Sequence, residues 1–449
     1  MKITKKLLEN VLDINNIPDA DFGNISIDSR TIQKSDIFIA IKGKNFDGNL
    51  FAKEALSKGA AIAIIDNKDC LLNENTILVG NSLEFLKDIG KYIKDTVAPR
   101  KIIAITGSVG KTTTKTWLKQ ILSKEFSSFS SPKNYNTIYG LPISLSLMPE
   151  NVDFGIFELG TNKQGEIAEL SKYLSPDIGI LTNIYEAHIG RFEDKNALAK
   201  EKLSLIDGIK SGGLLIYDGD SQFKDAIKNK AKSQNIKSVS VGFNDDCDFY
   251  IKEYGNKIAL ETPVGEIKYN ISVSGKRFSY ISATVIATLY SISCKIDMFL
   301  EYFTELSALD GRGKINEFLY DKNKIQIIDD SYNASPNAVL AAIEILESKE
   351  NSRKIAVIGQ MKDLGKLEEY YHKIIALKLF NANLDFIFFI GEKKLWDIFC
   401  NICKEKIICF EEINNSVIEK ILQTMGNMSV VLLKGSRSVG LEKFIEYLK

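Results

Sequence analysis

The sequence has no net charge of either sign and no long apolar run. Its 449 residues carry 58 Lys and Arg against 58 Asp and Glu, so no global field draws the chain onto nucleic acid or an anionic membrane. The longest apolar stretches, such as residues 60–65, are well short of the roughly 18 residues that suggest a membrane span. The start, MKITKKLLEN, is followed by polar and acidic residues rather than by the apolar core of a secretory signal. We therefore expect a cytoplasmic protein that binds any phosphate through a local site.

Cysteine is also scarce, with six residues scattered over the chain, which excludes a secreted fold built on disulfides. Cys400 and Cys403 form a CxxC pattern, but no second pair or histidine is near them in the sequence. Helical spacing gives the same pattern. We interpret the cysteines as reduced, buried thiols, and a metal or redox use of the pair is the alternative.

The length favours several domains, because a typical domain has roughly 100–200 residues. Residues 97–100 resemble a linker, and from there short apolar runs alternate with helical stretches, which predicts a mostly parallel sheet. A second such series begins near residue 312 and predicts a separate doubly wound unit. We expect an α/β protein of three domains: a mixed α/β domain over residues 1–98, a parallel-sheet domain over 99–311 and a Rossmann-like domain over 312–449.

The sharpest motif is a strand that runs into a glycine loop and then into a helix, from Lys101 to Thr114. The loop glycines let backbone N–H groups turn inward, the helix start adds partial positive charge, Lys111 reaches terminal phosphates and Thr112 offers a hydroxyl to Mg²⁺. The loop is shorter than the usual GxxxxGK[ST], because Ile105 stands where the first glycine would be. A glycine turn without a ligand is the alternative. The predicted ATP contacts are Gly107, Ser108, Val109, Gly110, Lys111, Thr112 and Thr113.

Two further polar segments follow strands and help to choose among nucleotide-binding proteins. FELGTN contains Glu158, a natural oxygen ligand for Mg²⁺, and TNIYEAHIG contains His188. By its chemistry alone His188 is better explained as a hydrogen-bonded loop histidine. We find no NKxD motif for reading a guanine base, so a regulatory GTPase is a poor interpretation.

The runs TGSVGKTTTK, NYNTIYGLPISL, FELGTN, NIYEAH and ALAKEKL together resemble the central ATPase domain of the Mur ligases and the related folylpolyglutamate synthases. This resemblance implies ATP and two Mg²⁺ ions, with Thr112, Glu158 and His188 among the metal ligands. It also implies a lysine that CO₂ converts into a carbamate, an oxygen ligand. Spacing from His188 points to Lys202 rather than Lys200. Without the family, Lys202 would be interpreted as part of a solvated helix face.

The amino-terminal third narrows the choice within the family. Residues 26–30, 36–43 and 45–48 resemble the UDP-sugar-binding domain of the Mur ligases, which a folylpolyglutamate synthase is not expected to carry. A small departure is Ser35, where family members often have glycine. The substrate contacts that the resemblance implies here are Ser29, Arg30, Lys42, Phe46, Asp47 and Gly48.

The carboxyl-terminal third resembles the branch of the family that adds a D-alanyl-D-alanine dipeptide. DDSYNASPN at 329–337, IGQMKDLG at 358–365 and LKGSRS at 433–438 carry the likeness, and no DNPR segment of the diamino-acid-adding branch is present. As bare patterns the first is a turn into a helix and the last a solvated loop. The resemblance implies ATP contacts at Asp330, Asn333 and Asn337, and substrate contacts at Lys434, Ser436 and Arg437.

One segment departs from the family pattern. Where members usually show a GxHN…NA sequence, residues 275–283 read GKRFSYISA, without the histidine and both asparagines. The adenine-side contacts implied there do not carry over.

Arg312 lies at the expected junction of the second and third domains. There it brings a guanidinium to the phosphates on closure or forms a structural interdomain ion pair.

The resemblance implies an ATP-dependent ligase that adds D-alanyl-D-alanine to UDP-N-acetylmuramoyl-tripeptide through an acyl phosphate. The catalytic residues would be Lys111, Glu158, His188, Lys202 and Arg312. We expect a monomer that binds these small molecules and no nucleic acid. The alternatives are another Mur or folyl-type amide ligase, and a noncatalytic nucleotide-binding switch. The diamino acid at the third position of the acceptor peptide stays open.

Overall fold

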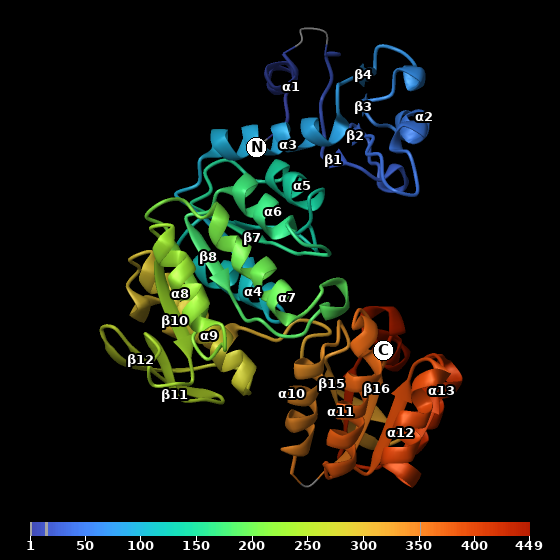
Figure 1. The fold of residues 1–449 in the computed structure, drawn as a ribbon. Helices are drawn as coiled ribbons and strands as arrows, with labels where there is room; N and C mark the ends of the chain where they lie inside the picture. The colour runs from blue at the N-terminus through green and yellow to red at the C-terminus, as the bar shows by residue number, and fades with distance from the viewer. Residues whose placement is uncertain (1, 14–16, 351) are drawn as a thin grey trace.

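A computed structural model describes residues 2–13, 17–350 and 352–449 of the chain. The protein is α/β, as predicted, and its strands form three separate sheets that follow one another along the sequence (Figure 1). Each sheet is rich in parallel pairs and carries helices on its faces. The described part of the chain contains no helix of the length and apolarity needed to cross a membrane.

The first sheet has four parallel strands in the order β1-β2-β3-β4. Their apolar runs are short and buried, and the long helix α3 packs beside them with Phe85, Leu86 and Ile89 inward. The opposite side of α3 contacts α5 (Gly140–Ser146) of the next unit (Figure 1). Tyr173 of α6 (Glu166–Leu174) also donates from Oη to Lys87 O at 2.7 Å. The elements are α1 (Lys5–Leu12), β1 (Ile25–Ser26), β2 (Ile37–Ile39), α2 (Ala52–Ser57), β3 (Ile62–Ile65), β4 (Thr76–Leu78) and α3 (Ser82–Val97).

The second sheet has nine strands in the order β13-β12-β11-β10-β9-β8-β5-β7-β6. The pairs from β6 to β11 are parallel, whereas β11-β12 and β12-β13 are antiparallel. The strands are β5 (Lys101–Thr106), β6 (Ser128–Ser130), β7 (Phe154–Glu158), β8 (Ile178–Leu181), β9 (Leu214–Asp218), β10 (Lys237–Gly242), β11 (Phe249–Glu253), β12 (Lys257–Thr262) and β13 (Gly265–Asn270). The alternation of short apolar runs predicted the parallel centre of this sheet but not its antiparallel edge.

Helices cover both faces of the second sheet and pack apolar side chains against it. Trp117, Leu118, Ile121 and Leu122 of α4 join one core with α9, while the residues of α5 and α6 join the other. Trp117 also donates its indole N–H to Ser307 O at 2.9 Å, which ties α4 to the chain that leads to the third sheet. The helices are α4 (Lys111–Leu122), α5 (Gly140–Ser146), α6 (Glu166–Leu174), α7 (Lys195–Leu203), α8 (Lys224–Ser233) and α9 (Lys276–Ser291).

The third sheet has six strands in the order β14-β15-β19-β16-β17-β18, and only the β14-β15 pair is antiparallel. Its strands are β14 (Lys314–Tyr320), β15 (Asn323–Asp329), β16 (Arg353–Gly359), β17 (Phe386–Ile390), β18 (Ile407–Phe410) and β19 (Ser429–Lys434). Its helices are α10 (Pro336–Glu347), α11 (Glu368–Asn381), α12 (Trp396–Cys403), α13 (Asn415–Gln423) and α14 (Glu442–Leu448). The doubly wound unit was predicted, and the hairpin strand β14 was not.

The cysteines are all free thiols in the described residues. Cys400 and Cys403 lie on α12, so helical spacing accounts for their CxxC pattern. Cys403 is buried and donates to Ala376 O at 3.4 Å, while Cys400 is exposed. The exact domain boundaries at residues 98 and 311 stay predictions.

Candidate functional site

The loop between β5 and α4 is shaped by two glycines with positive φ. Gly107 has φ +144°, and a Cβ there would lie 2.0 Å from Thr182 Oγ1, so no other residue fits without movement. Gly110 has φ +88° and caps the first turn of α4. Thr182 in turn donates to Val109 O at 2.7 Å. The segment after β8 therefore packs directly on the glycine loop, as adjacent parallel strands require.

The backbone N–H groups of this loop divide into two sets. Ser108 N donates to Asn183 O at 3.1 Å and Val109 N donates to Asn183 Oδ1 at 2.8 Å, so Asn183 fixes the loop from the neighbouring strand end. Lys111, Thr112 and Thr113 form the first turn of α4, where N–H groups have no acceptor within the helix. Such a turn attracts an anion, because its free N–H groups and the helix dipole act together.

Lys111 folds back over the loop that precedes it. Its Nζ donates to Gly107 O at 2.8 Å and to Ser108 O at 3.2 Å. Burial lowers the pKa of Lys111, while the nearby charge of Glu158 opposes that shift and the charge of Arg312 adds to it. These three charged side chains therefore lie within electrostatic reach of one another at one edge of the sheet.

Glu158 ends β7 and is held by residues from three other segments. Thr112 Oγ1 donates to its Oε2 at 2.8 Å, and Asn136 Nδ2 donates to its Oε1 at 2.9 Å. Lys115 Nζ lies 4.0 Å from Oε2, and the side chains of both Lys115 and Glu158 are buried. Burial raises the pKa of Glu158, but the charges of Lys111 and Lys115 outweigh it and leave that pKa lowered. The carboxylate is thus ionised and oriented.

Asn136 and Lys115 were not predicted as site residues. Asn136 lies in the segment NYNTIYG that contributed to the family resemblance, and its side chain reaches Glu158 only because the chain before α5 passes that strand end. Lys115 follows Lys111 by one helical turn on the same face of α4, which is a signal that spacing offers. It also donates to Ser131 O at 2.7 Å and so ties α4 to the end of β6.

Lys202 and Lys200 have opposite environments on α7. Lys202 is 3% exposed, while Lys200 is exposed to solvent. Burial, followed by repulsion from Lys111, lowers the pKa of Lys202 to about 7, so a large fraction of its amine is neutral near neutral pH. Glu201 beside it is buried and accepts from Gly165 N and Ile167 N at the start of α6, which anchors α7. A neutral, shielded amine is the form that reacts with CO₂.

His188 has φ +61° and lies at the start of a turn that contacts the third sheet's unit. Its Nδ1 is 3.1 Å from Asp363 Oδ2, and Arg191 Nη2 donates to Asp363 Oδ1 at 2.9 Å. Burial lowers the pKa of His188, with Asp363 opposing the shift. A neutral imidazole that donates its Nδ1–H to a carboxylate leaves the Nε2 lone pair for a ligand. Sequence reasoning missed Asp363, since 175 positions separate it from His188.

The donor set fits a hard cation better than a soft one. No three His, Cys, Asp or Glu side chains in the described ranges gather closely enough to hold a metal ion by themselves. The groups available instead are the Thr112 hydroxyl and the Glu158 carboxylate, which are in contact, while Lys202 is buried on α7 and its predicted carbamate stays a prediction. Together with phosphate oxygens these are ligands that Mg²⁺ prefers.

Across from this edge, the carboxyl ends of β15 and β19 bring together residues predicted for ATP and substrate. Lys434 is 3% exposed, and its Nζ lies 2.9 Å from Asp330 Oδ2 and donates to Asn333 O at 2.6 Å. Burial lowers the pKa of Lys434, and Asp330 opposes the shift. The side-chain oxygen of Asn333 accepts a hydrogen bond from Ala334 N. Asn337 lies in the first turn of α10.

Arg312 lies over an aromatic ring rather than against a carboxylate. Its Cζ is 4.0 Å from the centre of the Tyr332 ring, and Arg437 approaches the same ring at 5.7 Å. Among the described residues no carboxylate lies within ion-pair distance of Arg312, although the charges of Glu158 and Asp330 attract it. Both roles considered for Arg312 from the sequence stay predictions. Ser436, predicted for substrate, accepts from Lys362 N at 2.8 Å and thereby ties two strand ends together.

The residues predicted to contact a UDP sugar follow β1 and β2, at one edge of the first sheet. Arg30 is exposed, and its guanidinium pairs with Asp28, donating from Nε at 2.8 Å and from Nη2 at 2.7 Å. This pairing lowers the pKa of Asp28. Ser29 is buried and donates to Glu54 Oε2 at 3.1 Å, so its hydroxyl supports the turn.

The loop after β2 combines one rigid glycine with an exposed aromatic ring. A Cβ on Gly48 would lie 2.5 Å from Ile41 O, which excludes side chains there. Asp47 accepts from Asn49 N at 3.0 Å and approaches Lys42 Nζ at 4.0 Å. Phe46 is 59% exposed. An exposed aromatic ring beside charged groups on a rigid turn is a surface able to stack on a flat ring.

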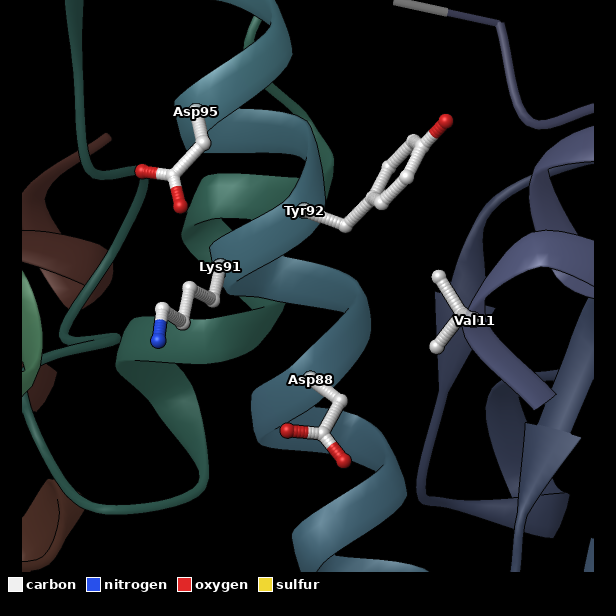
Figure 2. Close-up of a pocket in the computed structure, with 5 residues that line it drawn as sticks. All are labelled: Val11, Asp88, Lys91, Tyr92 and Asp95. Carbon is white, nitrogen blue, oxygen red and sulfur yellow. The ribbon is translucent and has the colours of Figure 1, made fainter. Parts of the chain in front are cut away.

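A separate shallow pocket lies along α3 and contains no residue of the predicted sites. Val11, Asp88, Lys91, Tyr92 and Asp95 line it. Figure 2 shows Tyr92 directed toward the side of Val11, while Lys91 and Asp95 point to the other side of the helix. The polar groups do not converge on one point, so we assign no ligand to this pocket.

The fold and the site are typical of a nucleotide-dependent enzyme that transfers phosphoryl groups. Such an enzyme has a glycine loop at the edge of a parallel sheet, with a buried carboxylate and basic side chains beside it. Family models described as "Mur ligase family, catalytic domain", "Mur ligase middle domain" and "Mur ligase, glutamate ligase domain" match residues 21–91, 105–289 and 316–437. The UDP-N-acetylmuramoyl-tripeptide--D-alanyl-D-alanine ligase of Rickettsia prowazekii is 30% identical, covering 98% of each chain. The chain therefore belongs to the Mur ligase family.

Solved structures agree with this assignment. MurF from Acinetobacter baumannii superposes with a TM-score of 0.88 at 25% identity, covering 100% of this chain and 99% of that one. MurF from Thermotoga maritima, in complex with ADP, superposes with a TM-score of 0.82 at 26% identity, covering 95% and 96%. The resemblance inferred from the sequence and the three-domain α/β fold are confirmed, while the roles of single residues stay predictions.

Proposed function

We propose that this protein is an ATP-dependent ligase that joins D-alanyl-D-alanine to UDP-N-acetylmuramoyl-tripeptide and releases ADP and phosphate. Full-length similarity to ligases of that name supports the substrate pair. The observation that carries the chemistry is the convergence of Thr112 on Glu158 at 2.8 Å, in the turn that also holds Lys111. This is the arrangement that phosphoryl transfer needs, since it requires positioning and charge neutralisation rather than a protein nucleophile.

The reaction takes two steps. An oxygen of the tripeptide's terminal carboxylate attacks the γ-phosphorus of ATP, a C–O–P linkage forms and ADP leaves. The neutral amine of D-alanyl-D-alanine then attacks the acyl carbon, the C–O bond breaks, phosphate leaves and the amine loses a proton. The first step is needed because an oxide is a poor leaving group from a free carboxylate.

Each residue of the site has a task in this scheme. Lys111 leaves the carbonyls of its own loop and neutralises the terminal phosphates, while the first-turn N–H groups of α4 hold them. Arg312, stacked on Tyr332 and without a carboxylate partner in the described residues, offers its guanidinium from the opposite side. Thr112, Glu158, His188 and a carbamate on Lys202 would hold Mg²⁺, which supplies further neutralisation of phosphate charge. The buried position of Lys202 favours the neutral amine that CO₂ requires.

The three sheets divide the substrates between them. We assign the UDP sugar to the loops after β1 and β2, ATP to the edge of β5, β7 and β8, and the dipeptide to the loop after β19 with Ser436 and Arg437. We further expect a cytoplasmic monomer, and both of these stay predictions.

Measuring phosphate release by the purified chain tests the function. We expect release that requires ATP, Mg²⁺, UDP-N-acetylmuramoyl-tripeptide and D-alanyl-D-alanine together, with tripeptides carrying lysine or another diamino acid assayed in parallel. Release that accepts a single amino acid or a folyl substrate instead would assign another ligase of the family. ATP hydrolysis indifferent to any acceptor would contradict a ligase and favour a nucleotide-binding switch.

A further inference from the structure

The first turn of α9 reaches the junction between the second and third sheets through one side chain. Arg277 Nη2 donates to Arg312 O at 2.7 Å, and Arg277 Nη1 donates to Asp330 Oδ1 at 3.3 Å. Its guanidinium also lies 4.8 Å from the centre of the Phe278 ring. Arg277 belongs to the segment GKRFSYISA, whose sequence departs from the family pattern. A basic side chain at a position that departs from the family pattern, Arg277, therefore contacts the backbone of Arg312, a predicted catalytic residue.

The junction is shaped to admit this contact. Gly313 has φ +88°, and a Cβ there would lie 2.4 Å from Arg277 Nη2. Gly311 has φ +69°, and its N–H donates to Asp329 Oδ2 at 2.9 Å. Asp329 also accepts from Gly313 N through its backbone carbonyl at 2.7 Å. The backbone around Arg312 is thus held by the third sheet on one side and by Arg277 on the other.

The charges at the junction are distributed unevenly. Asp330 is 5% exposed and lies between two cations, Lys434 at 2.9 Å and Arg277 at 3.3 Å. Arg312 instead stacks on Tyr332. Glu158 and Asp330 both attract Arg312 electrostatically, but Asp330 already pairs with Lys434 and Arg277, and among the described residues no carboxylate forms an ion pair with Arg312. A guanidinium without a carboxylate partner remains available to a phosphate.

We propose that Arg277 is a positioning residue that fixes the backbone of Arg312 and occupies Asp330, so that the guanidinium of Arg312 stays directed to the transferring phosphate. The proposal rests on the proposed function of Arg312. Arg277 touches no reacting atom in this scheme and acts only through Arg312. A purely structural tie between the second and third units would instead change stability without a specific effect on turnover.

A double-mutant cycle separates these roles. The variants are Arg277→Ala, Arg312→Ala and the double variant. Lys276→Ala is the matched control, because it removes a neighbouring charge from the same turn. The native Lys276 side chain lies over the Phe243 ring and not at the junction. The measurements are kcat and KM for ATP, UDP-N-acetylmuramoyl-tripeptide and D-alanyl-D-alanine, together with thermal midpoints. Arg277→Lys, which keeps the positive charge but lacks the planar fork of the guanidinium, tests rescue by a conservative change.

We expect Arg277→Ala to lower kcat by about 10- to 100-fold, since small misplacements of a catalytic group cost that much, while KM for the dipeptide stays unchanged. Arg277→Lys should recover part of the loss, and Lys276→Ala should retain wild-type kcat. In the Arg312→Ala background, Arg277→Ala should cause no further loss. If the two losses multiply, Arg277 acts independently and the proposal is overturned. Full activity of Arg312→Ala would overturn it as well, whereas a wild-type chain without dipeptide-dependent phosphate release would refute the proposed function itself.

Discussion

The edge of the second sheet and the edge of the first sheet occupy equivalent topological positions but are built differently. Glu158 is 4% exposed and Lys202 3% exposed, and contacts from neighbouring segments fix Glu158. Arg30 and Phe46, which follow strands of the first sheet, are exposed, and the guanidinium of Arg30 contacts only its near neighbour Asp28 among the described residues. Carboxyl ends of parallel strands can therefore carry either a preorganised charged site or an adaptable recognition surface.

This contrast leads to a rule for substitutions. Changes at the buried edge should lower kcat, because they remove interactions that matter most in the transition state. Changes at the exposed edge should raise KM for one substrate and leave kcat nearly intact, because they remove binding far from the reacting atoms. The following variants test the rule, from the largest expected effect to the smallest.

Lys111→Ala should lower kcat by about 1,000-fold, because the terminal phosphates lose a charge partner in a site shielded from water. Its fold should persist, since among the described residues Lys111 Nζ donates only to two carbonyls of its own loop. Steady-state kinetics and circular dichroism measure both properties. Lys119→Ala, on the same helix, is the control and should behave as wild type. Near-normal turnover by a folded Lys111→Ala protein would contradict the assignment of the glycine loop to the phosphates of ATP.

Lys202→Ala should lower kcat by about 10- to 100-fold, the usual cost of disturbing a metal site, and formate or acetate should restore part of it. Lys200→Ala is the matched control, because that lysine lies two residues away and is exposed. Carbon-13 NMR of protein equilibrated with labelled bicarbonate should show a carbamate signal in the wild type and in Lys200→Ala. Full activity of Lys202→Ala without added acid would reject the carbamate role.

Arg30→Ala should raise KM for UDP-N-acetylmuramoyl-tripeptide by about 10-fold, since the loss of one charged hydrogen-bonding group costs roughly that much affinity. The KM for ATP and kcat should change little. Thermal stability should also hold, because the exposed Arg30–Asp28 pair contributes little. Lys34→Ala removes an exposed charge nearby and serves as the control. If the KM for ATP changed as much as the KM for UDP-N-acetylmuramoyl-tripeptide, or more, the assignment of these two substrates to different sheets would be wrong.

His372 should produce the smallest effect, seen in stability rather than activity. Its Nε2 accepts from Met361 N at 3.0 Å and its Nδ1–H donates to Glu368 O at 2.7 Å. Burial lowers its pKa below the ordinary 6.5. The unfolded chain therefore binds the proton more readily, so stability is fully present above about pH 6.5 and is lost as the pH falls toward the folded-state pKa.

Urea unfolding between pH 5 and 8 measures this dependence. The decline below pH 6.5 should be shallower in His372→Gln than in the wild type, because the variant has lost one of the two histidines of the chain. His188→Asn should keep the part of the decline that belongs to His372. An identical slope in wild type and His372→Gln would contradict the role given to this histidine.

The sequence predicted those parts of the fold that have strong local signals. Buried parallel strands such as β5 and β16 are continuous apolar runs between helices, so their existence could be inferred. The antiparallel strands β12 and β13 have only six residues each, and the hairpin strand β14 has seven. Charged and apolar residues alternate in β13 (GEIKYN), but β12 (KIALET) and β14 (KINEFLY) show no regular alternation. Such short patterns are a weak signal, and these strands were missed.

The site followed the same logic. Lys111 was predictable because a motif carries it, whereas Asn136 reaches Glu158 through a chain path that only the folded topology reveals. Arg277 and Arg312 are separated by 35 positions, and their contact depends on how the second and third units meet. The burial of Lys202 could not be inferred from its helix, whose apolar and charged residues show no clear amphipathic division; only the family resemblance pointed to it.

The most direct test of the central claim follows oxygen from the peptide to phosphate. UDP-N-acetylmuramoyl-tripeptide labelled with ¹⁸O in both oxygens of its terminal carboxylate is incubated with ATP, Mg²⁺, D-alanyl-D-alanine and the purified chain, and the released phosphate is analysed by mass spectrometry. An acyl phosphate transfers one labelled oxygen to phosphate for each amide formed and leaves the other in the amide carbonyl. We predict this stoichiometry. Phosphate without label, released while the dipeptide is joined, would contradict the mechanism.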